Sequence, residues 1–206
     1  MKKLAWLLVV AGLLIGLYPQ GERAYTWYWQ QRLLTAWEEQ LPETTAVATE
    51  EAPAEEPGED DMKGILPRVP PPMGILAIDK INLELPLMRG ATTANLRVGA
   101  GLLEAGADPG ERGTAVITAH RSHTYGWQFN RLDELAAGDE IAITTGEAVY
   151  KYNVFKTEIV EPDAIMVQRG EGSETTLVLV TCHPLYSVNP PYRLVVRARQ
   201  IEPVVQ

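Results

Sequence analysis

The sequence has a single cysteine, Cys182, so no disulfide can form within the chain. It also lacks an excess of positive charge, because 18 Lys and Arg residues stand against 27 Asp and Glu residues and the formal net charge is −9. A nucleic-acid partner, which requires a basic surface to neutralise phosphates, is therefore not expected. No G-x-G-x-x-G fingerprint, Walker loop or Cys-x-x-Cys pair is present, so nothing indicates a nucleotide site or a dithiol redox site.

Long apolar runs are also scarce, and the one that stands out extends from Leu4 to Tyr18, directly after Lys2 and Lys3. Its basic start is typical of a signal peptide, but no small-x-small cleavage pattern follows Tyr18. The run has about 15 residues, fewer than the roughly 20 that span a bilayer. Lysines at one end and the aromatic residues around Trp27 at the other suit the two membrane surfaces. We therefore predict that residues 1–21 form an uncleaved single-pass anchor in the cell membrane, with the rest of the chain extracellular.

Two further segments precede the region that carries the chemistry. Residues 22–41 contain neither Pro nor Gly and place apolar residues at helical spacing, which predicts a juxtamembrane helix, with an irregular segment as the alternative. Residues 42–72 are rich in Pro and acidic residues and hold few large apolar residues. Such a composition does not bury enough apolar surface to offset the entropy of ordering, so we predict a disordered tether. Much of the acidity of the chain belongs to this tether and does not indicate an acidic active site.

The remaining residues, 73–206, carry a β pattern of alternating or Val-rich runs separated by turn residues. Asp79-Lys80 interrupts a first pair of strands, and Thr145-Gly146 joins a later pair. Only residues 92–104 and 130–140 look helical, with Asn130 as an N-cap and Gly138 as a stop. About seven or eight strands with few helices predict an all-β domain, either a closed barrel or a sandwich.

Three residues with suitable chemistry lie at strand ends. His120 ends the run AVITAH, Cys182 ends TLVLVTC, and Arg193 begins YRLVVRA. A thiolate is a strong nucleophile, and a nearby imidazole can ionise it or protonate a leaving amine. An arginine keeps its charge at every working pH and can stabilise an oxyanion. Thr181 stands beside the nucleophile and is expected to support it with its hydroxyl or its backbone.

These motifs closely resemble those of the sortases, the membrane-anchored cysteine transpeptidases of Gram-positive surfaces. The family signature T-L-x-T-C falls on residues 178–182, with Val178 at its first position, and the family arginine falls on Arg193. The resemblance covers about residues 74–202 and implies a closed eight-stranded β-barrel with short helices. It implies that Cys182 is the nucleophile and His120 the general acid/base. Arg193 would stabilise the oxyanion or the substrate backbone, and its R-x-V-V context favours it over Arg197.

The resemblance also implies the reaction and its partners. Cys182 would attack the Thr carbonyl of an LPxT-type sorting motif in a surface protein, and an amine of a peptidoglycan precursor would resolve the thioester. No cofactor is implied. Short loops, an N-terminal anchor and the absence of a C-terminal hydrophobic helix resemble class D. Class C, the pilus polymerases, is the alternative, but it usually adds a lid with an Asp-aromatic pair that the tether lacks.

Alternatives from other functional classes remain open. His120, His123, Cys182 and His183 offer a possible zinc set, although adjacent strand residues such as Cys182 and His183 point to opposite faces. A cysteine protease would use the same residues and pass the acyl group to water. An anchored β-domain without catalysis, such as an adhesin or a scaffold, would need no thiol.

Two smaller features complete the sequence. Residues 41–45 read LPETT, which is close to the motif that sortases cleave. Chance explains this stretch most simply, and a tether that weakly inhibits its own groove is the alternative. Some families of this fold bind calcium near the groove, but Glu104, Asp108 and Glu111 lie on predicted loops, where acidic residues are common. No metal is therefore predicted.

Overall fold

The computed structural model describes residues 3, 6, 12, 21, 24–37, 70–146, 148–167 and 174–204. The predicted anchor and the predicted tether, including the LPETT stretch, lie almost wholly outside these residues. Residues 24–37 are helical. Among the residues described, no helix has both the length and the apolar character needed to cross a membrane.

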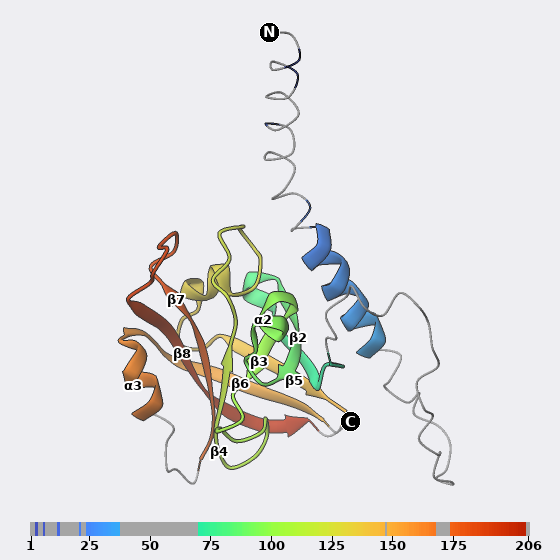
Figure 1. Cartoon of the computed structure of the whole chain (residues 1–206). Coiled ribbons are helices and arrows are strands. Elements are labelled where there is room, and N and C mark those ends of the chain that lie inside the picture. The colour runs from blue at the N-terminus through green and yellow to red at the C-terminus, as the bar shows by residue number, and fades with distance from the viewer. Residues whose placement is uncertain are drawn as a thin grey trace, which may run out of the picture.

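Eight strands of the described region close into one barrel, in the order β1-β2-β3-β4-β7-β8-β6-β5 (Figure 1). Their bounds are β1 Gly74–Ile78, β2 Leu83–Arg89, β3 Ala100–Leu102, β4 Gly113–Thr118, β5 Glu140–Thr145, β6 Val149–Val160, β7 Thr175–His183 and β8 Tyr192–Val204. The prediction of a closed eight-stranded barrel is confirmed, and the sandwich is wrong. Two neighbouring pairs, β2 with β3 and β4 with β7, run parallel, while the other neighbours run antiparallel.

Short helices connect these strands, namely η1 Asp79–Ile81, α2 Thr93–Val98, η2 Phe129–Glu134 and α3 Pro162–Val167. Thr92 caps α2, because its hydroxyl accepts a hydrogen bond from the Asn95 backbone at 3.2 Å. The prediction that Asn130 caps a helix is wrong. Asn130 is buried inside η2, and its side-chain amide donates to the Ser122 carbonyl at 2.6 Å instead. Gly138 lies in the turn after η2 with a φ of +100°, where glycine is favoured.

Alternation along the central strands sorts side chains between two apolar clusters. Leu177 and Leu179 of β7 point into the barrel, as do Leu194, Val196 and Ala198 of β8. Val178 and Val180 of β7 lie on the outer face, where they form a second cluster with Val116 and Val195. Continued alternation places Thr181 inside the barrel and Cys182 on its outer face.

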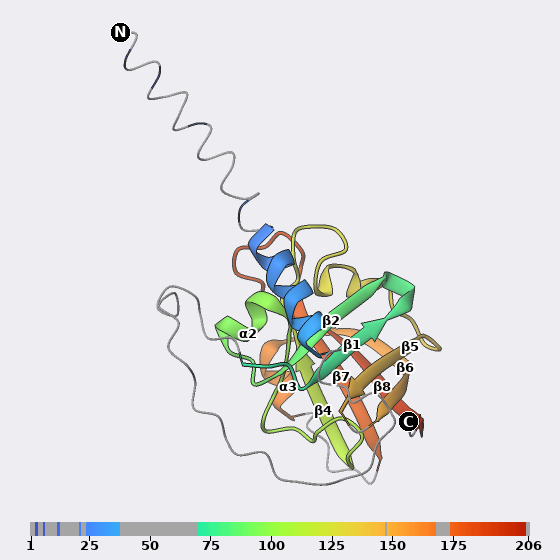
Figure 2. The same ribbon diagram turned by 90° about the vertical axis from the view of Figure 1, so that its right-hand side faces the viewer.

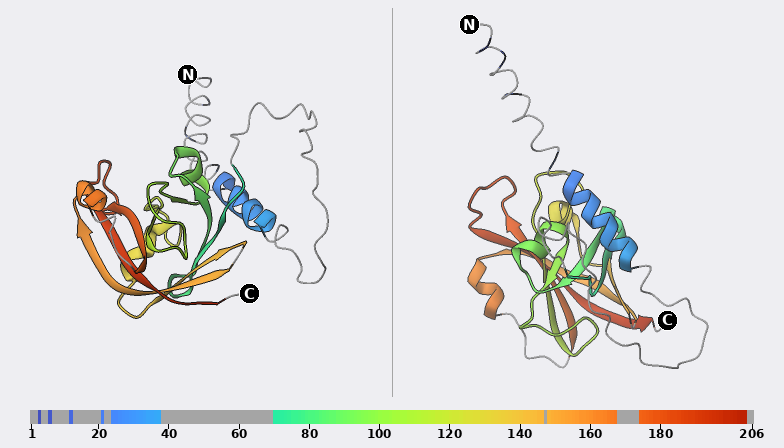
Figure 3. Two further views of the ribbon diagram at one scale, coloured as in Figure 1. Left: turned by 90° about the horizontal axis from the view of Figure 1, so that it is seen from below. Right: turned by 45° about the vertical axis from the view of Figure 1, so that its right-hand side comes forward.

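The helix of residues 24–37 packs along the barrel beside α2 (Figures 2 and 3). Leu33 and Trp29 contact Met88 of β2 and Val98 of α2. In these views the N-terminal end of this helix lies at the same end of the barrel as the loops that follow β4 and β7. This helix therefore lies close to the loops that follow β4 and β7.

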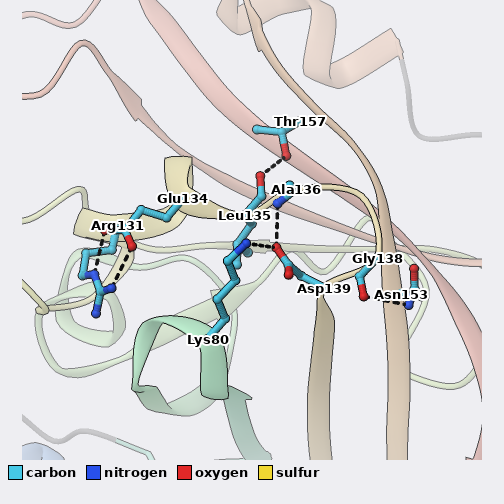
Figure 4. A network of polar contacts seen from close by, with 9 residues as sticks. All are labelled: Lys80, Arg131, Glu134, Leu135, Ala136, Gly138, Asp139, Asn153 and Thr157. Atoms are coloured by element: carbon cyan, nitrogen blue, oxygen red, sulfur yellow. Dashed lines mark hydrogen bonds and ion pairs between the residues drawn. The ribbon is translucent and has the colours of Figure 1, made fainter.

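A polar network fixes the turn between η2 and β5 (Figure 4). One carboxylate oxygen of Asp139 accepts hydrogen bonds from the Ala136 backbone and from the Lys80 ammonium, each at 2.7 Å. The Thr157 hydroxyl of β6 donates to the Leu135 carbonyl at 2.9 Å. These bonds attach the turn after η2 to η1 and to β6. They therefore hold the far end of the connection between β4 and β5 against the barrel.

Candidate active site

The parallel register of β4 and β7 brings His120 and Cys182 level with each other. The last ladder pair of these strands is Thr118 with Val180. One residue further, the Thr181 hydroxyl donates to the Ala119 carbonyl at 2.8 Å, which maintains the same register. The next level joins His120 and Cys182. Neighbouring strands lie about 4.8 Å apart, so the continued register puts the backbones of these two residues side by side.

Both residues belong to the outer face. Ala119 and Arg121 are buried on either side of His120, whose side chain is exposed. Thr181 is buried before Cys182, whose thiol is free and half-buried. The imidazole and the thiol therefore share one face of the barrel and are accessible to a substrate.

Arg193 lies on the other side of the thiol. It is directly opposite Cys182 in the antiparallel pair of β7 and β8. Its Nη1 donates to the carbonyls of Pro190 and Tyr192, each at 2.9 Å, which holds the guanidinium at the start of β8. Arg197 is level with Val178 instead, and its Nε donates to Glu158 at 2.7 Å. The nucleophile candidate therefore stands between an imidazole on one neighbouring strand and Arg193 on the other.

The environment of His120 disfavours its charged form. Although the side chain keeps exposed surface, the residues around it remove part of its hydration, and this desolvation lowers the pKa of His120 below its usual value of 6.5. Desolvation thus favours neutral His120, the form that can accept a proton, although it also makes the imidazole a weaker base.

Thr181 uses its hydroxyl inside the barrel. Thr181 is 1% exposed, and its hydroxyl group donates its hydrogen bond to the Ala119 carbonyl. The prediction that Thr181 supports the nucleophile thus takes a specific form, since this bond joins the residue before Cys182 to the residue before His120.

Arg121 is a charged residue near the site that the sequence analysis missed. Its side chain is only 4% exposed, and its Nη2 lies 2.9 Å from Oδ2 of Asp133. Its Nη1 lies 2.9 Å from Nδ1 of His183, the residue after Cys182. Strand alternation past His120 was the only signal for this inward orientation.

A cavity of about 360 Å³ lies beside His120. Its walls come from the helix of residues 24–37, from α2 and from the loop after β4, and the lining residues are Thr26, Thr93, Arg97, His120, Ser122, Trp127 and Gln128. Neither Cys182 nor Arg193 is among them. The imidazole therefore lines this cavity in addition to sharing the barrel face that carries the thiol. No sequence pattern indicates that Thr26 lies beside His120.

The rim of the site carries no formal charge. Residues 122–128 after β4 and residues 184–192 between β7 and β8 contain no Asp, Glu, Lys or Arg. They expose Tyr125, Tyr186, Val188 and Tyr192. The ring centroids of His123 and Tyr186 are 5.1 Å apart, so the two loops contact each other.

The candidate metal ligands do not converge. His123 packs against Tyr186, and His183 contacts Arg121. Asp108, considered for calcium, accepts two hydrogen bonds from Arg89 at 2.8 and 3.1 Å. Within the described ranges, no three His, Cys, Asp or Glu residues are grouped so that they could hold an ion.

Comparison with known proteins gives one consistent family. Residues 76–201 match the Sortase domain. Sortase D of Bacillus subtilis (strain 168) is 32% identical over 129 residues, which are 62% of this chain and 63% of that protein. The match therefore spans less than two thirds of the relative's own length.

Solved structures are similar over a comparable share of the chain. Sortase A from Corynebacterium diphtheriae has a TM-score of 0.59 and 32% identity, covering 64% of this chain and 61% of that one. A Sortase D5 transpeptidase of Clostridium perfringens has a TM-score of 0.57 and 29% identity, covering 64% of this chain and 79% of that one.

Proposed function

Because the chain belongs to the sortase family, we propose that it is a cysteine transpeptidase that cleaves an LPxT-type sorting motif and transfers the acyl group to a cell-wall amine. One observation carries the proposal, namely that Arg193 is opposite Cys182 across β7 and β8 and that the β4–β7 register, continued past its last pair, puts His120 beside Cys182. This arrangement supplies a nucleophile, a proton carrier and a fixed positive charge at one place.

The first step forms the thioester. His120 takes the proton of the thiol, and the Cys182 sulfur attacks the carbonyl carbon of the motif threonine. Arg193, held by two backbone carbonyls, stabilises the negative charge that develops on the carbonyl oxygen. The C–N bond then breaks, and His120 gives its proton to the leaving amine.

The second step reverses these transfers with a new amine. The acceptor amine attacks the thioester carbon and gives a proton to His120, and the sulfur leaves and regains that proton. Both amines must reach His120, and the cavity that His120 lines together with Thr26 and Thr93 is the space that we assign to them. The lining is more apolar than polar, so the hydrocarbon part of an amine-bearing chain can pack there while Thr26, Thr93 and Ser122 offer hydroxyl groups.

The rim supports an uncharged substrate. Leu, Pro and Thr carry no charge, so a peptide of the LPxT type meets no opposing charge on loops 122–128 and 184–192. The exposed tyrosines offer apolar surface with a polar end, which suits such a peptide. An acidic or basic peptide would receive no compensating ion pair there.

We further assign the chain to class D, as a cysteine peptidase-type transpeptidase anchored in the cell membrane with its barrel outside. Similarity to a Sortase D and to a Sortase D5 supports the class. The apolar run after Lys2 and Lys3 supports the anchor. Neither assignment is needed for the chemistry above.

A transpeptidation assay tests the proposal. The full chain is incubated with LPxT peptides that end in Gly or Ala and with an amine-bearing acceptor peptide, and the products are separated by mass. We expect a ligated product that is lost in Cys182→Ala and kept in Arg197→Met. Cleavage without ligation would favour a protease that uses water, and no cleavage at all would favour the anchored β-domain.

A further inference from the structure

The segment that carries His120 lies beyond the end of the β4–β7 ladder. The last ladder pair joins Thr118 to Val180. Past it, the Ala119 backbone donates to the Val180 carbonyl at 3.3 Å, and Thr181 donates to the Ala119 carbonyl. These bonds fix the chain only up to the residue before His120. Whatever holds the other side of His120 therefore determines where the imidazole stands.

On that side the His120 carbonyl accepts a hydrogen bond from the Phe129 backbone at 3.1 Å, and Arg121 pairs with Gln128, so the segment is held to the start of η2. The Arg121 side chain adds the attachment to β7. Its Nη1 contacts Nδ1 of His183, so the residue after His120 is joined to the residue after Cys182. One side-chain bond, from Thr181 to Ala119, joins the residues before His120 and Cys182. A second, between Arg121 and His183, joins the residues after them. Both bonds lie on the inner face, so neither occupies the face that carries the imidazole and the thiol.

We propose that Arg121 is a positioning residue that holds the His120 imidazole level with the Cys182 thiol. The effect on turnover that we expect from this position rests on the proposed function. Arg121 does not reach the substrate in this account, because its side chain is buried on the opposite face. It acts through the backbone of its neighbour.

The chemistry of the guanidinium explains why arginine suits this position. A guanidinium can only donate, so Nδ1 of His183 must accept, and a neutral His183 carries its proton on Nε2. The planar fork reaches two acceptors at once, His183 at the end of β7 and Asp133 in η2. One side chain thereby joins three segments, those of His120, Cys182 and η2. A lysine offers a point charge and cannot span both acceptors in the same way.

The energetics indicate that the Arg121 contacts contribute more to the position of His120 than to the stability of the fold. The Arg121 charge is buried, and its Nε has no hydrogen-bond partner among the described residues. Its carboxylate partner, Asp133, is 53% exposed and can be solvated without it. A buried charge with partial pairing is often no more stable than an apolar side chain of similar volume. Replacing Arg121 by methionine should therefore leave the fold nearly intact while it removes the side-chain link between the segment of His120 and the end of β7.

Kinetics of Arg121→Met in the full chain test the inference. A misplacement of about 1 Å can lower a rate on the order of 10²-fold, so we expect kcat to fall by about that factor with KM nearly unchanged. Arg121→Lys should recover part of the rate. The matched control is Arg197→Met, which removes another largely buried arginine with a carboxylate partner but should leave kcat unchanged.

The pairing with His183 gives a second criterion. His183→Leu should lower kcat as well, and adding it to Arg121→Met should lower kcat little further, because both changes remove the same contact. Independent, multiplying losses would overturn the inference. So would an unchanged kcat in Arg121→Met, or a loss of kcat that matches a loss of folded protein in urea denaturation.

A readout without turnover separates this inference from the proposed function. His120→Gln should change the alkylation rate of Cys182, because the imidazole neighbours the thiol, and this effect should shrink in the Arg121→Met background. If the native chain forms no ligated product, the transpeptidase proposal fails, and the alkylation experiment still decides the role of Arg121. An effect of equal size in both backgrounds would overturn that role.

Discussion

Cys182 and Arg193 are directly opposite each other across β7 and β8. Antiparallel partners on the same face have Cβ atoms about 5 Å apart, which places the guanidinium within reach of any group bound to the thiol. Two bonds to the Pro190 and Tyr192 carbonyls fix its orientation before a substrate arrives. Such preorganisation is what makes a charge effective in a transition state.

Arg193→Ala should lower kcat/KM on the order of 10² to 10³-fold, as expected for the loss of one oxyanion donor. Arg193→Lys should recover only part of this loss, because an ammonium cannot donate to both carbonyls and the substrate in the same geometry. Steady-state kinetics with an LPxT peptide measure both. If Arg197→Met lost as much activity as Arg193→Ala, the assignment of the arginine would be wrong.

Thr181→Val should cost both stability and rate. Valine keeps the shape of the side chain but leaves the buried Ala119 carbonyl without its donor, which should lower the free energy of unfolding by about 1 to 3 kcal/mol. Thr181→Ser keeps the hydroxyl and should retain most of the rate. Urea denaturation and kcat measured on the same samples check this, and a Val variant as active and stable as the native chain would contradict it.

His120 should titrate below 6.5 in the folded chain, because desolvation lowers its pKa. An unfolded histidine titrates near 6.5, so the unfolded state binds more protons over the interval between the two pKa values. This group therefore lowers stability as the pH falls through 6.5, and its contribution becomes constant below the folded pKa. An NMR titration of the imidazole, assigned with His120→Gln, measures the pKa directly. A value at or above 6.5 would contradict the site as described.

Tyr152 should make the barrel sensitive to alkaline pH. Its side chain is fully buried, and desolvation raises its pKa to about 12, although the hydrogen bond from the Gly110 backbone at 2.9 Å opposes this shift. The folded pKa is above the unfolded value near 10, so the stabilisation is present below pH 10 and is lost as the pH rises toward 12. The loss amounts to about 2 to 3 kcal/mol over that interval.

Tyr152→Phe isolates this contribution. At neutral pH the variant should be less stable by about 1 kcal/mol, because the Gly110 donor loses its acceptor. Between about pH 10 and 12 its stability should fall less steeply than that of the native chain. Parallel stability curves for the two proteins would contradict the assignment.

Most strands could be predicted because their local signals are strong, but β3, Ala100–Leu102, lies within residues 92–104, where the sequence pattern predicts a helix and α2 ends at Val98. Turn residues bound the runs around Asp79 and Thr145, and β-branched residues fill β7 and β8. The strand order could not be derived from the same signals. The parallel pairing of β4 with β7 joins residues such as Thr118 and Val180, which are far apart in the chain, and no local pattern specifies it. The strand patterns fit a barrel and a sandwich equally, and only the family resemblance favours the closed barrel.

Some residues of the site could be predicted from local patterns, and others could not. His120, Cys182 and Arg193 could be predicted as a set because each stands at the end of a strand-like run. Arg121 could not, since an arginine in a loop after a strand is usually solvated. Its burial depends on His183 and Asp133, which only the folded chain brings to it. Asn130 was misassigned for a related reason, because its partner is the Ser122 carbonyl of the preceding loop and not the end of a helix.

The central claim is that Cys182 carries the acyl group, and intact-mass spectrometry of the full chain with LPxT peptides tests it most directly. The account predicts an adduct of the mass of the acyl fragment on the native chain, released by hydroxylamine and absent in Cys182→Ala. A thiol that alkylates readily but never acquires such an adduct with any of these peptides would contradict it.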